Sequence, residues 1–192
     1  MLRSKMDVFE NKIIEPMLFQ EAKVFDSPDY LYELKLDGIR CLAYLDKEET
    51  VLINKRGKNL NSTYPELTKL HQEVKERMIL DGELIVIKDN KPDFFALQTR
   101  SLITDPLKIK IQMKLNPVQY IAFDILYLRD KLLIAYPLIE RKRLLNENLK
   151  NSNKLTISKY IEREGKAFYK LVKEQGLEGI VAKEKMSKYY PG

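Results

Sequence analysis

The chain has 192 residues, of which 44% are hydrophobic and 32% are charged. This length and balance predict a soluble, globular domain with a sizeable core and exclude a disordered chain. The 34 Lys and Arg residues outnumber the 28 Asp and Glu residues, giving a formal charge of +6. That charge favours a polyanionic partner such as nucleic acid, although a lysine-rich solvated surface explains it equally well.

The cysteine and histidine content excludes several kinds of site. Cys41 and His71 are the only residues of their types, so neither an internal disulfide nor a Cys/His zinc cluster is possible, and a Ser-His-Asp triad is disfavoured. A chain without disulfides is typical of a reducing compartment, so we expect a cytoplasmic protein, associated with the nucleoid if bacterial. Residues 1–7 lack the apolar core of a signal peptide, and charges interrupt every candidate membrane span, so we expect no membrane contact.

The first part of the chain predicts an arm followed by strands. Residues 1–29 contain prolines that favour a short helix or arm with loops. Three apolar runs rich in β-branched and aromatic residues then predict a meander of antiparallel strands. They occupy residues 30–36, 39–46 and 50–54. A basic loop at 55–59 follows, and Pro65 opens a predicted helix, capped by Ser62 or Thr63.

The remainder of the chain mixes strands and helices. Strands are predicted at 78–87, 118–128, 154–161 and 179–183, the first interrupted by Asp81-Gly82-Glu83. Helices are predicted at 93–102, 106–115, 138–149 and 165–175. These elements lack the regular βαβ alternation of a parallel sheet, so we expect an α+β fold with mainly antiparallel sheets and flanking helices. Residues 187–192 predict a loop.

Lysines, arginines and carboxylates at strand ends are the candidate reactive groups. They are Lys35, Asp37, Arg40, Arg56, Asp81, Glu83, Glu178 and Lys183, with Phe123 and Asp124 inside one strand. A lysine amine, with an ordinary pKa of about 10.4, must lose its proton before it attacks, and neighbouring cations lower its pKa. Carboxylates such as Glu178 and Glu83 suit magnesium, which bridges protein carboxylate and substrate phosphate. The combination predicts attack by an amine on a phosphate.

Residues 35–40, KLDGIR, resemble the K-x-D-G-x-R nucleophile motif of the covalent nucleotidyltransferases, which include DNA ligases, RNA ligases and mRNA capping enzymes. Four further elements follow in the order of that superfamily: Arg56-Gly57, Asp81-Gly82-Glu83, Phe123-Asp124 and the run EGIVAK at 178–183. Within the superfamily, three stretches make the chain most similar to the adenylation domain of a small ATP-dependent DNA ligase of bacterial or viral type. They are residues 15–18, 137–145 and 187–192.

The resemblance implies that residues 1–192 form one adenylation domain with a nucleotidyltransferase (ATP-grasp-like) fold. It implies that Lys35 attacks the α-phosphate of ATP, that AMP passes from Lys35 to the 5′-phosphate of a nick in double-stranded DNA, and that the 3′-hydroxyl seals the nick. It also implies a monomer that uses Mg²⁺ or Mn²⁺. The implied contacts are Phe123 on the adenine face, Glu33 at the adenine edge, Arg40 and Glu83 on the ribose, Arg56 on the sugar or DNA phosphate, Lys183 on the α-phosphate, and Glu178 on the metal with Asp37 or Asp81.

Simpler alternatives remain at three of these positions: core packing for Phe123, turn chemistry for Asp81 and a solvated loop charge for Arg56. Three alternatives remain for the function: an RNA ligase, a GTP-using capping guanylyltransferase, or a ligase-like module that binds nucleic acid without catalysis. ATP-dependent ligases continue past a Pro-Gly loop into a W-x-K-x-K-like strand and an OB-fold domain, and neither is present in this sequence. If the chain is complete, we expect it to bind ATP, to self-adenylate weakly or not at all, and to seal nicks inefficiently.

Overall fold

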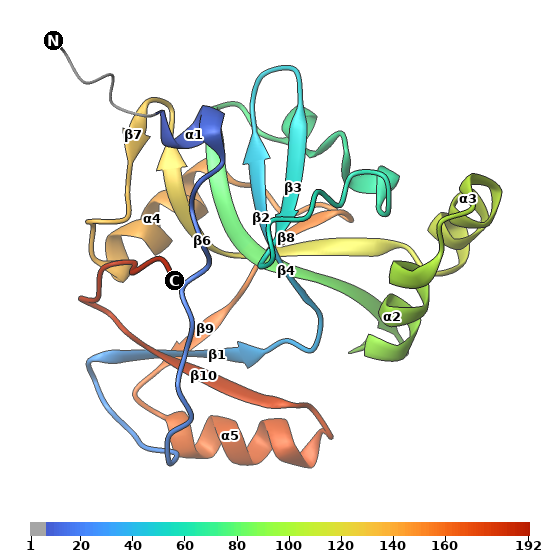
Figure 1. Cartoon of the computed structure of the whole chain (residues 1–192). Coiled ribbons are helices and arrows are strands. Elements are labelled where there is room, and N and C mark those ends of the chain that lie inside the picture. The colour runs from blue at the N-terminus through green and yellow to red at the C-terminus, as the bar shows by residue number, and fades with distance from the viewer. Residues whose placement is uncertain (1–6) are drawn as a thin grey trace, which may run out of the picture.

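The computed structural model describes residues 7–192 as two β-sheets with helices around them (Figure 1). Residues 1–6 lie outside the described part. They make up most of residues 1–7, the segment in which the sequence predicts no signal peptide. Within residues 7–192, no helix combines the length and the apolar character that crossing a membrane requires.

The larger sheet has seven strands, and its main path runs in the order β3-β2-β4-β6-β7. Its strands are β2 (Ile39–Leu45), β3 (Thr50–Asn54), β4 (Met78–Lys88), β5 (Lys91–Pro92), β6 (Val118–Leu128), β7 (Lys131–Leu132) and β8 (Leu155–Ile157). The β5 strand pairs with β4, and β8 pairs with β6 in the one parallel pairing of the described chain. The smaller sheet has the order β10-β1-β9, from β1 (Tyr30–Lys35), β9 (Tyr160–Glu162) and β10 (Gly179–Glu184).

Five α-helices and two short 3₁₀ turns complete the described chain. They are α1 (Val8–Asn11), α2 (Phe94–Leu102), α3 (Pro106–Leu115), α4 (Leu138–Asn148), α5 (Gly165–Glu174), η1 (Pro65–Leu67) and η2 (Leu70–Glu73). Aspartate side chains cap α2 and α3 at their first turns, as the sequence pattern favours. The α+β class with mainly antiparallel sheets is therefore confirmed, as are the helices predicted at 93–102, 106–115, 138–149 and 165–175.

Three predicted elements are wrong in detail. The strand at 30–36 does not join the predicted meander, because β1 pairs along its whole length with β10 in the smaller sheet. The strand predicted at 154–161 is two strands, β8 and β9, which belong to different sheets. The helix predicted at Pro65 is the pair of turns η1 and η2, and no side chain caps η1. For the two strands, pairing with distant segments outweighed the local pattern.

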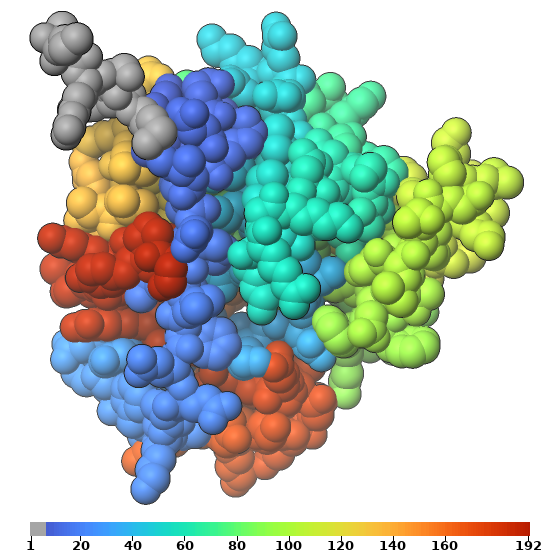
Figure 2. Space-filling model, viewed as in Figure 1, coloured from blue at the N-terminus to red at the C-terminus, as the bar shows by residue number. Residues whose placement is uncertain are grey.

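Two hydrophobic clusters cover the two faces of the larger sheet. One cluster includes Leu80, Leu97 of α2 and Leu145 of α4. On the other face, Phe9 of α1 and Tyr189 near the C-terminus pack with residues of the central strands. Figure 2 shows the segment after α1, in blue, running down the front of the molecule beside the red C-terminal loop. We call residues 12–29 the arm and residues 185–192 the C-terminal loop.

The two Asp-Gly pairs need glycine because other backbone lies against them. A Cβ on Gly38 would lie 2.2 Å from the Leu84 carbonyl oxygen, and one on Gly82 would lie 2.4 Å from the Ile121 carbonyl oxygen. The predicted interruption at Asp81-Gly82-Glu83 is wrong, because β4 passes through it with only a register shift against β6. Glycine is therefore needed at these positions because another backbone segment approaches closely, and not because the chain turns there.

We expect Gly82→Ala to lower the free energy of unfolding by about 3 kcal/mol, because the added methyl group collides with the Ile121 carbonyl and the Tyr120 ring. Urea denaturation measures this loss. Gly57→Ala is the control: its Cβ meets nothing within 4 Å, and only its left-handed backbone (φ +76°) opposes the change, at about 1 kcal/mol. Equal losses in the two variants would contradict the close-approach explanation.

Candidate active site

The candidate nucleophile lies at the end of β1 and faces the strand that follows α5. Glu33 and Lys35 share one face of β1 because side chains alternate along a strand, and they pair in register with Val181 and Gly179 of β10. Glu178, immediately before β10, forms an ion pair with the Lys35 amine. The Lys35 and Glu178 side chains are 32% and 35% exposed, so the pair is open to a substrate. The structure thus brings together two residues separated by most of the chain.

An aromatic ring flanked by two cations lies in the same region. Phe123, on β6, has the Arg40 guanidinium carbon 4.4 Å from its ring centroid and the Lys183 amine also at 4.4 Å. Arg40 belongs to β2 of the larger sheet and Lys183 to β10 of the smaller sheet. Cations at these distances attract the electron-rich face of the ring. Phe123 is therefore a half-buried platform where the two sheets meet, and not simply part of the core.

The buried carboxylate of Glu33 is held by two lysines. Its Oε1 lies 2.6 Å from the Lys142 amine and 3.1 Å from the Lys183 amine, and Glu33 is 1% exposed. Burial opposes ionisation of Glu33, but Lys183 and Lys142 keep the pKa of this carboxyl below its ordinary value. Burial and the charge of Lys183 lower the pKa of Lys142 to about 8, against the opposing effect of Glu33.

Lys142 and its neighbour Arg141 were missed as functional residues, although they lie in a stretch that resembles DNA ligases. Arg141 makes two hydrogen bonds to the Asp124 carboxylate, at 2.8 and 2.9 Å, beside the Phe123 platform. The two cations share the buried face of α4 with Leu138 and Leu145. This spacing of i, i+3, i+4 and i+7 was the available signal, because it puts two charges where an amphipathic helix normally buries apolar side chains.

Asp81 holds Arg40 inside the protein. Arg40 donates from Nε and Nη2 to the two oxygens of Asp81, both at 2.6 Å, and the Tyr189 hydroxyl donates to Oδ2 at 2.7 Å. Asp81 is fully buried. The turn alternative for Asp81 is therefore wrong, and its expected part in metal binding has little support because both oxygens already accept hydrogen bonds within the protein.

Glu83 lies two residues further along β4, on the same face as Asp81. Burial raises the pKa of Glu83 to about 8, and the nearby carboxylates of Asp81 and Asp37 act in the same direction, against Arg40 and Lys35. Near neutral pH the carboxyl is therefore mostly protonated. A neutral carboxyl both donates and accepts hydrogen bonds.

Asp37 and Arg56 lie in exposed loops. Asp37 is between β1 and β2, and Arg56 follows β3, where its backbone N–H donates to the Asn54 side chain at 2.9 Å. Across residues 7–192 no three acidic, Cys or His side chains gather into a metal cluster. Magnesium needs less, since it binds one or two protein carboxylates together with substrate phosphates. The exposed carboxylates of Glu178 and Asp37 fit that kind of site.

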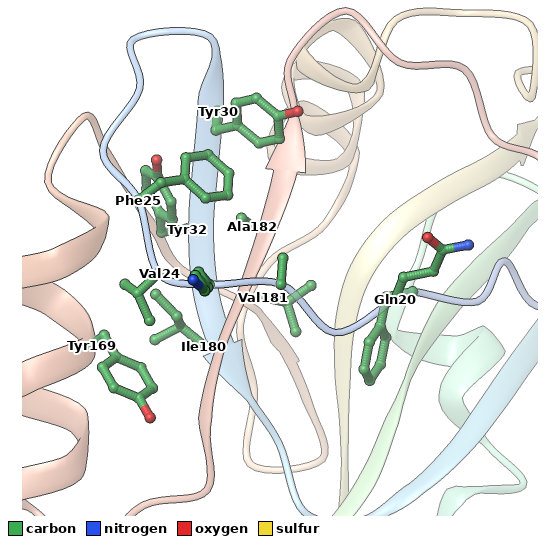
Figure 3. Close-up of a pocket in the computed structure, with 12 residues that line it drawn as sticks. Gln20, Val24, Phe25, Tyr30, Tyr32, Tyr169, Ile180, Val181 and Ala182 are labelled. Atoms are coloured by element: carbon green, nitrogen blue, oxygen red, sulfur yellow. The ribbon is translucent and has the colours of Figure 1, made fainter.

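A separate pocket of about 320 Å³ lies under the arm (Figure 3). Its aromatic lining comes from Phe19, Phe25, Tyr30, Tyr32 and Tyr169 of α5. Tyr30 and Tyr32 alternate along β1 with Glu33 and Lys35 and therefore face away from them. Phe19 links the two regions, since its ring centroid is 5.7 Å from the Lys35 amine. The candidate active site is thus the open region around Lys35, Glu178 and Phe123, beside this pocket.

Comparison with known proteins relates this chain to DNA ligases. Residues 16–192 match the model of the ATP-dependent DNA ligase domain. DNA ligase C1 of Mycolicibacterium smegmatis is 33% identical over 97% of this chain and 56% of its own length. The SPbeta prophage-derived DNA ligase-like protein LigB of Bacillus subtilis is 31% identical over 92% of this chain and 62% of its own length. The chain therefore spans less than two thirds of either relative.

Solved structures agree with the sequence comparison. Mycobacterial DNA ligase D complexed with ATP and MES superposes with a TM-score of 0.78, at 26% identity over 93% of this chain and 56% of that one. The nucleotidyltransferase fold expected from the sequence is thereby confirmed.

We expect Lys142→Met to lower the free energy of unfolding by about 3 kcal/mol, because it leaves the buried Glu33 carboxylate with one of its two cations. Urea denaturation at pH 7 measures the loss. Adding Glu33→Gln to Lys142→Met should recover part of it, since the uncompensated charge is then gone. Lys188→Met, which changes an exposed lysine, is the control and should cost little. A loss that Glu33→Gln does not reduce would contradict the ion-pair explanation.

We expect wild type to lose stability relative to Glu83→Gln as the pH rises from 5 to 9. The folded protein binds a proton at Glu83 up to about pH 8, whereas the unfolded chain releases it near pH 4.5. The stabilising contribution is therefore complete below pH 4.5 and lost as the pH rises through 8, with a difference on the order of 4 kcal/mol between pH 5 and pH 9. Urea denaturation across this range measures it, with Glu48→Gln, an exposed position, as the control. A pH-independent difference would contradict the raised pKa.

Proposed function

The chain belongs to the family of ATP-dependent DNA ligase domains, and on that premise we propose that residues 1–192 act as the adenylation domain of a DNA ligase, with Lys35 as the nucleophile. The observation that carries the proposal is the open pair of Lys35 and Glu178 beside the Phe123 platform. An amine, a carboxylate and an aromatic ring flanked by cations are what nucleotide binding and amine attack on a phosphate require.

In the proposed reaction, the Lys35 amine attacks the α-phosphorus of ATP. A phosphoramidate bond forms between Nζ and phosphorus, the bond from the α-phosphorus to the bridging oxygen breaks, and pyrophosphate leaves. The Lys35 amine, which is paired with Glu178, attacks in its neutral form, so one proton leaves to solvent before the attack and a second leaves as the bond to phosphorus forms. Magnesium, which we propose Glu178 and Asp37 hold, supplies charge neutralisation on the phosphates. Mn²⁺ prefers similar oxygen ligands and is a substitute.

We propose that the adenine stacks on Phe123, with its edge towards Glu33. Arg40 and the mostly neutral Glu83 then contact the ribose, for which a carboxyl that both donates and accepts is suited. Lys183, already beside the platform, contacts the α-phosphate. Arg56, on its exposed turn, contacts the sugar or a DNA phosphate. The Arg40 and Lys183 cations also favour the approach of a polyanion such as ATP.

The later steps concern the whole protein and are likewise proposals. AMP passes from Lys35 to the 5′-phosphate of a nick in double-stranded DNA, and the 3′-hydroxyl displaces AMP to seal the strand. We propose that the protein acts as a monomer in the cytoplasm. DNA ligase C1 and ligase D are named as DNA ligases, which favours DNA over the RNA ligase, capping and non-catalytic alternatives.

Incubation with α-labelled ATP and magnesium should transfer label to the protein, and Lys35→Ala should abolish the transfer. Labelled GTP should give none, because we propose that Glu33 and Phe123 recognise adenine. Denaturing electrophoresis detects even weak labelling, and Lys188→Ala at an exposed position is the matched control. Labelling that survives Lys35→Ala, or preferential labelling by GTP, would refute the proposal. Challenge of labelled protein with nicked DNA against nicked RNA then tests the substrate.

A further inference from the structure

Tyr189 closes a ring of hydrogen bonds around the cation that flanks the Phe123 platform. Its hydroxyl donates to Asp81 Oδ2 at 2.7 Å and accepts from the Met17 backbone N–H at 2.8 Å. Arg40 Nη2 donates to the Met17 carbonyl at 3.3 Å and to the same Asp81 oxygen at 2.6 Å. The four residues come from the C-terminal loop, the arm, β2 and β4. Figure 1 shows the C-terminus beside the arm.

Two members of the ring are buried, Arg40 and Met17 are half-buried, and the donors and acceptors match. Tyr189 is 4% exposed and Asp81 is fully buried. Burial and the neighbouring Asp81 carboxylate raise the pKa of Tyr189, so the hydroxyl keeps the proton that it donates. A buried carboxylate that loses one of its donors is free to rotate or must be rehydrated. The orientation of the Arg40 fork therefore depends on a hydroxyl that does not itself touch Arg40.

The C-terminal loop is held in place by other bonds around Tyr189. The Tyr189 backbone N–H donates to the Ile134 carbonyl at 2.8 Å, and Arg141 donates to the Ser187 carbonyl at 3.2 Å. Because Arg141 also binds Asp124, the residue after Phe123 on β6, the loop is connected both to Arg40 and to the strand that carries Phe123. A displacement of the loop would thus reach Arg40 through Tyr189 and Asp81.

We propose that Tyr189 is a positioning residue for Arg40, through which nucleotide binding depends on the placement of the arm and the C-terminal loop. The inference rests on the proposed function only in taking ATP as the nucleotide. On this inference, Asp81 and the arm orient the Arg40 guanidinium, and the position of the C-terminal loop affects the site.

Tyr189→Phe removes the hydroxyl and keeps the ring and its packing. We expect the side-chain Nε–H of Arg40 to exchange with solvent about tenfold faster in this variant, because no hydroxyl then holds Asp81 and Met17, the partners of Arg40. NMR measures this exchange without nucleotide. Tyr190→Phe, at the neighbouring 61% exposed residue, is the control and should leave the exchange unchanged. Unchanged exchange in Tyr189→Phe would overturn the inference, whatever the protein binds.

ATP titration by calorimetry tests the consequence for binding. Tyr189→Phe should raise the Kd for ATP about tenfold in the wild-type background and far less in an Arg40→Lys background, where the guanidinium fork is absent. Equal weakening in both backgrounds would show that Tyr189 does not act through Arg40. Thermal melting confirms that the variants fold. Asp81→Asn, which changes the acceptor of the Tyr189 hydroxyl, should also speed the Arg40 exchange and raise the Kd for ATP. Wild type that binds no ATP would refute the proposed function, while the Arg40 exchange would still decide the positioning role.

Discussion

Two lysine ammonium groups, one from α4 and one from β10, meet at a single oxygen of the buried Glu33 carboxylate. Glu33 lies on β1, two residues before Lys35, so this contact fixes the strand that presents the candidate nucleophile. Each buried charge is tolerable only because the others are present, since an isolated ion in the interior costs several kcal/mol. The smaller sheet, α4 and the nucleophile strand are therefore held together by mutual charge compensation as well as by apolar packing.

The same principle organises the rest of the site. Arg40 is compensated by Asp81 and Arg141 by Asp124, each through a two-point contact that restricts the guanidinium plane. Lys35, in contrast, is a third exposed and paired with an equally exposed carboxylate. Buried pairs thus hold the framework, while the partly exposed pair of Lys35 and Glu178 is the one that we propose takes part in the reaction. This division places rigid support behind a site that a polyanionic substrate can enter.

Local patterns explain which parts of the fold could be predicted. The helices at 94–102 and 106–115 begin at aspartate caps, and β2, β3, β4 and β6 are rich in apolar residues with only a few polar ones among them, so their signals are contained in a few neighbouring residues. The wrong predictions concern which strands pair. The β1 strand pairs with β10, which is distant in the sequence, and not with β2, and the run at 154–161 is divided between two sheets. Strand pairing of this kind depends on packing between distant segments, which no local window contains.

By itself, the sequence determined the chemistry available to the protein: a lysine in a KLDGIR run, the acids and cations that follow in order, and the family to which they belong. Tertiary structure alone decided how these groups are used. It turned Asp81 inwards onto Arg40 and Tyr189, raised the pKa of Glu83 by burial, and put Lys142 and Arg141 of α4 behind the site. Charge state and orientation follow from neighbours in space, and only the folded chain brings residues from the arm, the sheets and the C-terminal loop into contact.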